Sequence, residues 1–161
     1  MGVAGSGKTT IGQLLALRHG GKFFDADDYH PPGNVAKMSL GIPLNDTDRL
    51  PWLNRLRSEV IDASSPNEFT VLACSALKHS YRKILGLHQP GIGTVFLNGD
   101  PATLAERLSS RAGHYMKPGM LDSQLETLEV PSMTEAFHIP IILTPQQIVE
   151  RIEIHFQIPP A

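Results

Sequence analysis

The sequence predicts an α/β protein with a parallel sheet. Short apolar runs alternate with longer segments in which apolar residues recur every three or four positions, as they do in helices. The compact apolar run at residues 69–74 is typical of a strand that is buried on both faces. The first ten residues, MGVAGSGKTT, place a glycine-rich loop directly before the first helical segment. Right-handed crossovers between parallel strands put ligand sites at the carboxyl ends of the strands.

Four apolar runs are predicted to be strands, and each is followed by polar or glycine-containing sequence. They lie at residues 22–25, 69–74, 94–97 and 139–143.

The predicted helices alternate with these strands. The first ends at Gly20-Gly21, and Pro51 should lie in or just before the first turn of its helix. Asp100 and Pro101 suit the N-cap and first position of the helix after the third run. The helical segments are 8–19, 34–38, 48–63, 78–87, 101–111, 120–128 and a last one marked by Ile148, Ile152 and Phe156.

The bulk composition predicts one globular domain over residues 1–161. No run approaches the roughly 18 apolar residues of a membrane helix. A net charge of −2 without a basic cluster argues against a nucleic-acid partner. The single cysteine, Cys74, favours a reducing compartment such as the cytoplasm, and we expect it to be a buried small hydrophobe.

The opening loop fits the pattern G-x-x-x-x-G-K-[ST], which binds nucleotide phosphates. Glycines let successive N–H groups point at an anion, and the helix N-terminus adds partial positive charge. Lys8 would neutralise the β- and γ-phosphates, and the Thr9 hydroxyl would ligate Mg²⁺, so ATP and Mg²⁺ are the expected cofactors. The residues predicted to surround the nucleotide phosphates are Gly2, Val3, Ala4, Gly5, Ser6, Gly7, Lys8, Thr9 and Thr10.

The stretch FDADDYH continues from the apolar run at residues 22–25, which corresponds to the second strand of a phosphate-loop fold. Residues two apart in a strand share a face, so Asp25 and Asp27 are expected to face the site together. One carboxylate would take the proton of an acceptor hydroxyl, with Asp27 the preferred candidate, and the other, Asp25, would hold Mg²⁺ through water. The residues alone leave this assignment open, and a solvated acidic turn is the alternative.

Four stretches together resemble the small gluconokinases: GVAGSGKTT, FFDADDYHPPGNVAKMSLGIPLNDTDRLPWL, LACSALKHSYRKIL and LNGDPATLAERLSSRAGHYMKPGMLDSQLETLE. The resemblance implies phosphorylation of D-gluconate at its 6-hydroxyl by ATP. It also implies a three-layer αβα P-loop fold with a parallel five-stranded sheet, a lid at about residues 112–120 and often a homodimer. The alternatives are a shikimate-like kinase of another small metabolite, or an inactive isoform with a binding or regulatory role.

The stretch PLNDTDR and its surroundings supply candidates for binding the acid acceptor. Arg49 suits a carboxylate because guanidinium binds it in a planar fork, whereas Asp46 and Asp48 could simply cap a helix. The residues expected to contact gluconate are Asp27, Lys37, Asn45, Arg49 and Lys78.

Three further residues complete the predicted site. The Ser75 hydroxyl, just past a buried strand, could bind a magnesium-bound water. Arg107 and Arg111 lie four apart before the lid, where they could neutralise the transferring phosphoryl or, for Arg111, lie against adenine. The alternative for both is surface charge near a helix C-terminus.

The start of the chain departs from the family that it resembles. Family members have an apolar strand before the first glycine, and here only Met1 precedes it. That strand would lie centrally in the sheet. The free energy gained by burying its side chains would be comparable with the whole free energy of unfolding of a domain, about 5–15 kcal/mol. We expect a fragment, an alternative start or a misplaced gene start, with weak folding and reduced activity if this is the mature protein.

Overall fold

The computed structural model describes residues 1–65, 67–110 and 120–159 and confirms the α/β class. The strands are β1 (Lys22–Asp25), β2 (Thr70–Ala73), β3 (Val95–Asn98) and β4 (Phe137–Pro140). The helices are α1 (Lys8–Arg18), the 3-10 helix η1 (Ala26–Tyr29), α2 (Pro32–Ser39), α3 (Asp46–Leu56), the π-helical turn η2 (Arg57–Ile61), α4 (His79–Leu85), α5 (Pro101–Ser109), α6 (Met120–Thr127) and α7 (Pro145–Phe156). Within the described ranges, no helix has the length and apolar character needed to cross a membrane.

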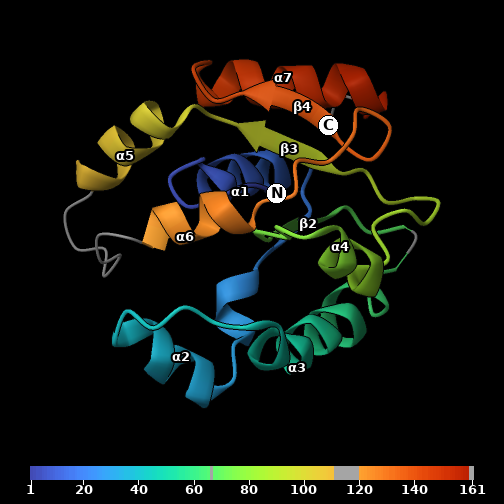
Figure 1. Cartoon of the computed structure of the whole chain (residues 1–161). Coiled ribbons are helices and arrows are strands. Elements are labelled where there is room, and N and C mark those ends of the chain that lie inside the picture. Colours follow the sequence, from blue (N-terminus) through green and yellow to red (C-terminus); the bar gives the residue numbers. More distant parts are fainter. Residues whose placement is uncertain (66, 111–119, 160–161) are drawn as a thin grey trace.

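The strands pair in parallel, β1 with β2 and β3 with β4. In the described part of the chain these pairs form two separate two-stranded sheets. The first residues of the chain lie between them, because the backbone oxygen of Met1 accepts from Leu97 N at 3.0 Å and Gly2 N donates to Ser75 O at 3.3 Å. The phosphate loop therefore starts at the carboxyl end of β2, beside β3 (Figure 1).

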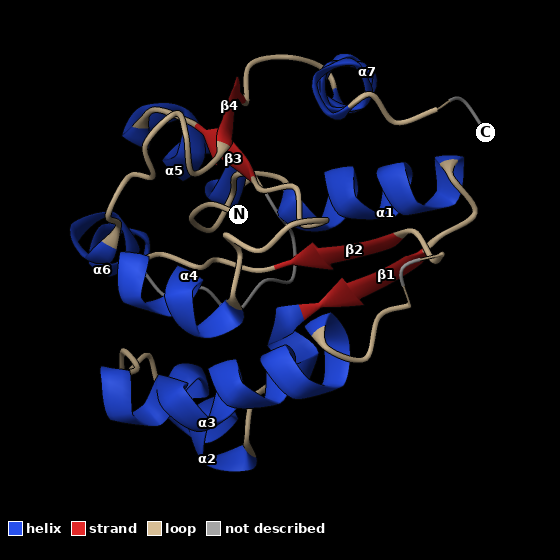
Figure 2. Ribbon diagram, turned by 90° about the vertical axis from the view of Figure 1, so that its right-hand side faces the viewer, coloured by secondary structure: helices blue, strands red, loops and turns tan. Residues whose placement is uncertain are grey.

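Helices cover both faces of the β1–β2 pair, which gives the expected three layers. In Figure 2, α1 lies on one face with α7 beyond it, and α3 lies on the other. One apolar cluster includes Ile11, Leu97 and Val149, and a second includes Trp52 and Leu85. Each cluster fills the space between the strands and one helical layer.

Cys74 belongs to the second apolar cluster and is buried, as predicted. Burial raises the pKa of its thiol to about 11, so the thiol stays protonated at neutral pH. The residue therefore packs as a small hydrophobe.

Two glycines fix the position of α1. Gly7 has φ +92° at the N-cap, a conformation that residues with a Cβ rarely adopt. A Cβ on Gly12 would lie 2.6 Å from the ring of Phe23, so the helix backbone approaches β1 as closely as a glycine allows. This contact sets where the helix N-terminus, and with it the phosphate loop, meets the strand ends.

Some predicted boundaries are wrong. Strand β4 begins at Phe137 and ends at Pro140, earlier than the predicted 139–143. Helix α3 begins at Asp46, so Pro51 lies in its second turn, where the missing N–H removes one helical bond. The predicted helix 48–63 changes to a π-helical turn at Arg57, because the N–H five residues on bonds to the Arg57 oxygen at 2.8 Å.

Arg82 is buried and holds the loop that follows β2. Its Nη1 donates to the backbone oxygens of Ala76 and Leu77, each at 3.2 Å, and of Glu129 at 3.0 Å. Ala76 has φ +46°, so this guanidinium secures a strained turn beside Ser75.

Replacing Arg82 with leucine should lower the free energy of unfolding by about 2–5 kcal/mol, because two buried carbonyl oxygens and one partly buried carbonyl oxygen would lose a charged donor. Urea unfolding measures the change. The control is Arg151→Leu, on the exposed face of α7, which should stay within about 0.5 kcal/mol of the parent. Equal effects of the two changes would contradict a structural role for Arg82.

Candidate active site

The phosphate loop forms a tight turn ahead of α1. Gly2, Gly5 and Gly7 all have positive φ angles, which allows the loop to turn its N–H groups toward one side. The ammonium of Lys8 donates to Val3 O at 3.0 Å and is thereby held over its own loop. The arrangement unites an anion-binding backbone, a helix N-terminus and one cation, as phosphate binding requires.

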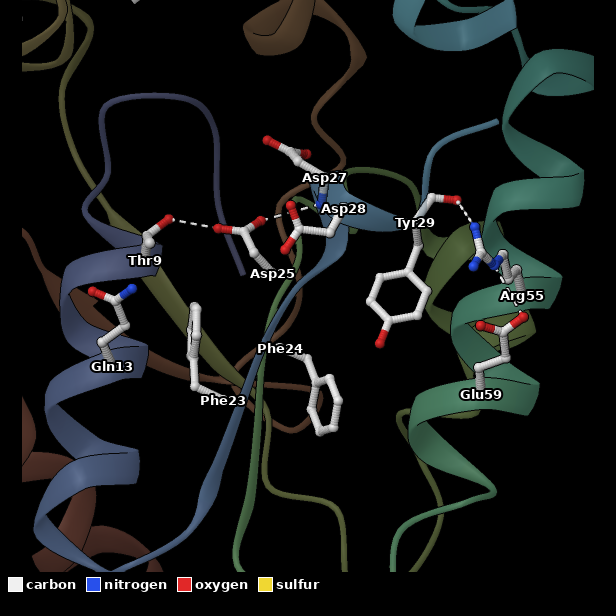
Figure 3. Close-up of a pocket in the computed structure, with 10 residues that line it drawn as sticks. All are labelled: Thr9, Gln13, Phe23, Phe24, Asp25, Asp27, Asp28, Tyr29, Arg55 and Glu59. Atoms are coloured by element: carbon white, nitrogen blue, oxygen red, sulfur yellow. Dashed lines mark hydrogen bonds and ion pairs between the residues drawn. The ribbon is translucent and has the colours of Figure 1, made fainter. Parts of the chain in front are cut away.

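A chain of hydrogen bonds joins this loop to the end of β1 (Figure 3). Thr9 Oγ1 donates to Asp25 Oδ2 at 2.9 Å, and Asp25 Oδ1 accepts from Asp27 N at 3.1 Å. Asp25 thus caps η1, whose first turn contains Asp27. The expectation that both aspartates share a strand face is wrong, because β1 ends at Asp25 and the chain turns into η1 there.

The oxygens of Thr9 and Asp25 suit a hard cation such as Mg²⁺. Across the described residues, no group of three or more His, Cys, Asp or Glu side chains is arranged to hold a metal ion. Mg²⁺ commonly binds through one or two protein oxygens, with water and phosphate completing its octahedron. The donor set is therefore sufficient for a nucleotide-associated ion.

An open cavity of about 670 Å³ lies along the outer side of β1 (Figure 3). Its polar end is formed by Thr9, Asp25 and Asp27, so these side chains are accessible to ligands. The remaining lining residues are Gln13, Phe23, Phe24, Asp28, Tyr29, Arg55 and Glu59.

A second charged cluster surrounds the N-terminus of α3. Lys37 Nζ lies 2.6 Å from Asp48 Oδ1, and Lys78 Nζ lies 2.7 Å from Asp46 Oδ1. Hydrogen bonds from Lys78 and Tyr81 lower the pKa of Asp46, and hydrogen bonds from Lys37 and a backbone N–H lower the pKa of Asp48. Both carboxylates are thus charged at neutral pH and hold the two lysines in place.

The other predicted acceptor residues lie in the same cluster. Asn45 caps α3 by accepting from Asp48 N at 2.8 Å, and Asp48 completes the capping box. Arg49 Nε donates to Leu44 O at 3.2 Å, and its guanidinium lies 5.6 Å from the centre of the Tyr81 ring. The structure therefore brings Lys37, Asn45, Arg49 and Lys78 together around one helix terminus.

The remaining predicted residues are spread along the sheet edge. Ser75 lies just past β2 and touches the loop through its backbone, and Thr10 is exposed in the first turn of α1. Arg107, on α5, donates to the backbone oxygen of Ile141. Arg111 and all but the last residue of the predicted lid lie outside the described residues.

Gln124 is a contact residue that the sequence did not reveal. Its Oε1 accepts from Ala4 N at 2.7 Å, so α6 is attached to the phosphate loop. The two residues are 120 positions apart, and nothing local in either segment indicates the pairing.

Two buried side chains, Trp52 and Asn34, connect η1 with the charged cluster at the start of α3, and the sequence did not indicate either contact. Trp52 Nε1 donates to Ala26 O at 2.7 Å, which fixes η1 on α3. Asn34 Nδ2 donates to Asp48 O at 2.9 Å and lies 3.3 Å from His30 Nδ1. Trp52 and Ala26 are 26 residues apart and Asn34 and Asp48 are 14 apart, so no local pattern indicates these bonds.

The pKa of His30 gives a pH prediction. Burial and the nearby Arg49 cation lower it from 6.5 to about 4. The unfolded chain takes up this proton near pH 6.5 and the folded chain only near pH 4, so stability present above pH 6.5 should be lost as the pH falls through that window. In urea unfolding between pH 7 and pH 4, His30→Phe should lose less stability than the parent. If the free energies of unfolding of the parent and of His30→Phe changed equally with pH, the prediction would be wrong.

The sequence is similar to those of known kinases. The family model described as shikimate kinase matches residues 4–150. The thermosensitive gluconokinase of Escherichia coli K12 is 47% identical over 135 residues, covering 84% of this chain and 72% of that protein. The gluconokinase of Gluconobacter oxydans 621H is 43% identical over 162 residues, covering 98% and 89%.

Solved structures give the same result. A sugar kinase from Janibacter sp. HTCC2649 is similar with a TM-score of 0.89 and 39% identity, covering 99% of this chain and 93% of that one. A gluconokinase from Sinorhizobium meliloti 1021 has a TM-score of 0.81 and 40% identity, covering 99% and 95%. An APS kinase from Mycobacterium tuberculosis, at 16% identity and a TM-score of 0.71, shares the P-loop kinase fold. Sequence and structure together place this chain in the gluconokinase family.

Proposed function

We propose that this chain transfers the γ-phosphoryl group of ATP to the 6-hydroxyl of D-gluconate. The observation that carries the proposal is the connection of two sites through η1. The phosphate loop reaches Asp27 through Thr9 and Asp25, and α3, which bears Arg49, is fixed to η1 by Trp52. A phosphate donor and an acid acceptor can therefore be bound next to one carboxylate.

In this proposal the loop amides and Lys8 hold the β- and γ-phosphates. Thr9 and Asp25 would hold Mg²⁺, with the Ser75 hydroxyl on one of its waters, and the ion would neutralise phosphate charge. Asp27 accepts the proton of the 6-hydroxyl of gluconate while the oxygen of that hydroxyl bonds to the γ-phosphorus of ATP. The bond to the β–γ bridging oxygen breaks, and ADP leaves.

The acceptor carboxylate is assigned to the cluster at the start of α3. Arg49 would clamp it, with Lys37, Asn45 and Lys78 binding the carboxylate or the hydroxyls of the chain. Arg107 and Arg111 stay predicted nucleotide contacts, and the cytoplasmic location and homodimeric state stay predictions from the sequence.

A coupled assay for ADP tests the proposal. Turnover should require both Mg²⁺ and D-gluconate, and should stop when EDTA removes the metal. Shikimate and other sugar acids at equal concentration serve as competing acceptors. Turnover with one of these and none with gluconate would overturn the assignment.

Arg49→Lys should raise the KM for gluconate by about 10–100-fold, because lysine cannot reproduce a planar pair of charged hydrogen bonds. The KM for ATP should stay within about threefold, since Arg49 belongs to the acceptor cluster. Arg151→Lys, an exposed change on α7, is the matched control. Steady-state kinetics in both substrates measures the effect, and an unchanged KM for gluconate would remove Arg49 from the acceptor site.

A further inference from the structure

We propose that His30 is a positioning residue that holds the carboxylate of Asp27 in line with the acceptor hydroxyl. The inference rests on the proposed function, in which Asp27 is the general base. His30 lies at the C-terminal end of η1, three residues after Asp27, and its Nε2 is 4.0 Å from Asp27 Oδ1.

The His30 ring is fixed by stacking. It lies nearly parallel to the ring of Trp52, with centroids 4.3 Å apart and an interplanar angle of 14°. Trp52 is 2% exposed and is tied through Nε1 to Ala26 O, and the His30 side chain is only 6% exposed. The imidazole therefore has one orientation relative to η1.

The tautomer of His30 is fixed as well. The buried Asn34 side chain faces the carbonyl oxygen of Asp48 at 2.9 Å, and this contact requires its amide nitrogen there. The same nitrogen lies 3.3 Å from His30 Nδ1. In the neutral imidazole Nδ1 then accepts, so the proton is on Nε2, the nitrogen that faces Asp27.

The neutral state of this histidine matters for the base. Burial and the Arg49 cation hold the pKa of His30 at about 4, so the ring is uncharged at neutral pH. A cation beside Asp27 would stabilise its charged form strongly and weaken it as a proton acceptor. A neutral N–H orients the carboxylate at a smaller loss of basicity.

The 4.0 Å separation agrees with this role. The Asp27 side chain is 87% exposed, so its carboxylate has room to rotate toward Nε2 once an acceptor arrives. Catalytic hydrogen bonds are often long without substrate and shorten in the complex. With Asp25 capping one end of η1 and Trp52 holding its first residue, His30 provides the third fixed point around the base.

The test compares three changes at one position. His30→Phe keeps an aromatic ring on Trp52 and should lower kcat by about 10–100-fold, with both KM values within about threefold. His30→Gln, whose amide nitrogen takes the place of Nε2, should retain at least about a third of kcat. Methionine has nearly the shape of glutamine but no hydrogen-bond donor, so His30→Met should lower kcat as much as His30→Phe does. This comparison of methionine with glutamine keeps the test valid if the phenylalanine variant is unstable.

His138→Phe is the matched control. His138 is also partly buried, packs edge-on to Phe96 and bonds to Pro131 O, on the other sheet. It should change kcat by less than about threefold. If His30→Phe lowers kcat no more than His138→Phe does, or if glutamine and methionine at position 30 behave alike, the positioning role is refuted.

A double-mutant cycle with Asp27→Asn separates this inference from the proposed function. If His30 acts through Asp27, then His30→Phe should cost less than about threefold in the Asp27→Asn background. A loss as large there as in the parent would refute the inference. Full activity of Asp27→Asn alone would instead refute the assignment of the base, and with it the premise of this subsection.

Discussion

Lys8→Ala should lower kcat by about 1,000-fold or more. The Lys8 ammonium is the cation held directly over the phosphate loop, where its hydrogen bond to Val3 O places it. Charge that builds on the transferring phosphoryl group in the transition state would lose its nearest neutralising group, and losses of this kind are among the largest known for phosphoryl transfer. The loss should appear in kcat more than in the KM for gluconate.

The control for this change is Lys83→Ala. Lys83 is exposed on α4 and should change kcat by less than about twofold. A thermal melt of each variant shows whether the fold is intact. A folded Lys8→Ala protein with near-parental kcat would mean that the loop does not bind the reacting phosphates.

Asp27→Asn should lower kcat by about 100–10,000-fold, because the amide cannot take the proton of the acceptor hydroxyl. The KM for ATP should stay within about threefold, since the loop and Lys8 are unchanged. The effect is measured by the same coupled assay for ADP, with gluconate and Mg-ATP near saturation.

Two neighbouring carboxylates make this test specific. Asp28→Asn removes the next acidic residue of η1 and should lower kcat by less than about tenfold, because one carboxylate serves as base. Asp25→Asn should raise the Mg²⁺ concentration needed for activity, since Asp25 bonds to the Thr9 hydroxyl. If added Mg²⁺ restores Asp27→Asn and leaves Asp25→Asn inactive, the two roles are exchanged.

Features of the fold with a local cause were predictable from the sequence. Asp100 accepts from Thr103 N at 3.0 Å with Pro101 at the first helical position, as the dipeptide indicated. The turn of the phosphate loop follows from its own glycines, and the apolar runs became parallel strands. In the cap and the phosphate loop the interacting groups lie within a few residues of one another, whereas the strands that pair are far apart in the sequence and only their apolar runs are local.

Features that depend on tertiary contact were missed or misread. Asp25 and Asp27 were expected to share a face as residues two apart in a strand do, but β1 ends at Asp25, which caps the 3-10 helix that contains Asp27. Both side chains line the same cavity. Asn45 caps α3, although it was expected only to bind the acceptor. The pairing of Lys78 with Asp46 spans 32 residues, a distance at which propensity and periodicity carry no signal.

The most direct test of the central claim is a crystal structure with a non-hydrolysable ATP analogue, Mg²⁺ and D-gluconate. The account predicts the amides from Gly5 to Thr9 around the β- and γ-phosphates, and the 6-hydroxyl of gluconate within about 3 Å of the Asp27 carboxylate. A nucleotide bound away from this loop, or an Asp27 side chain directed away from the sugar acid, would contradict it.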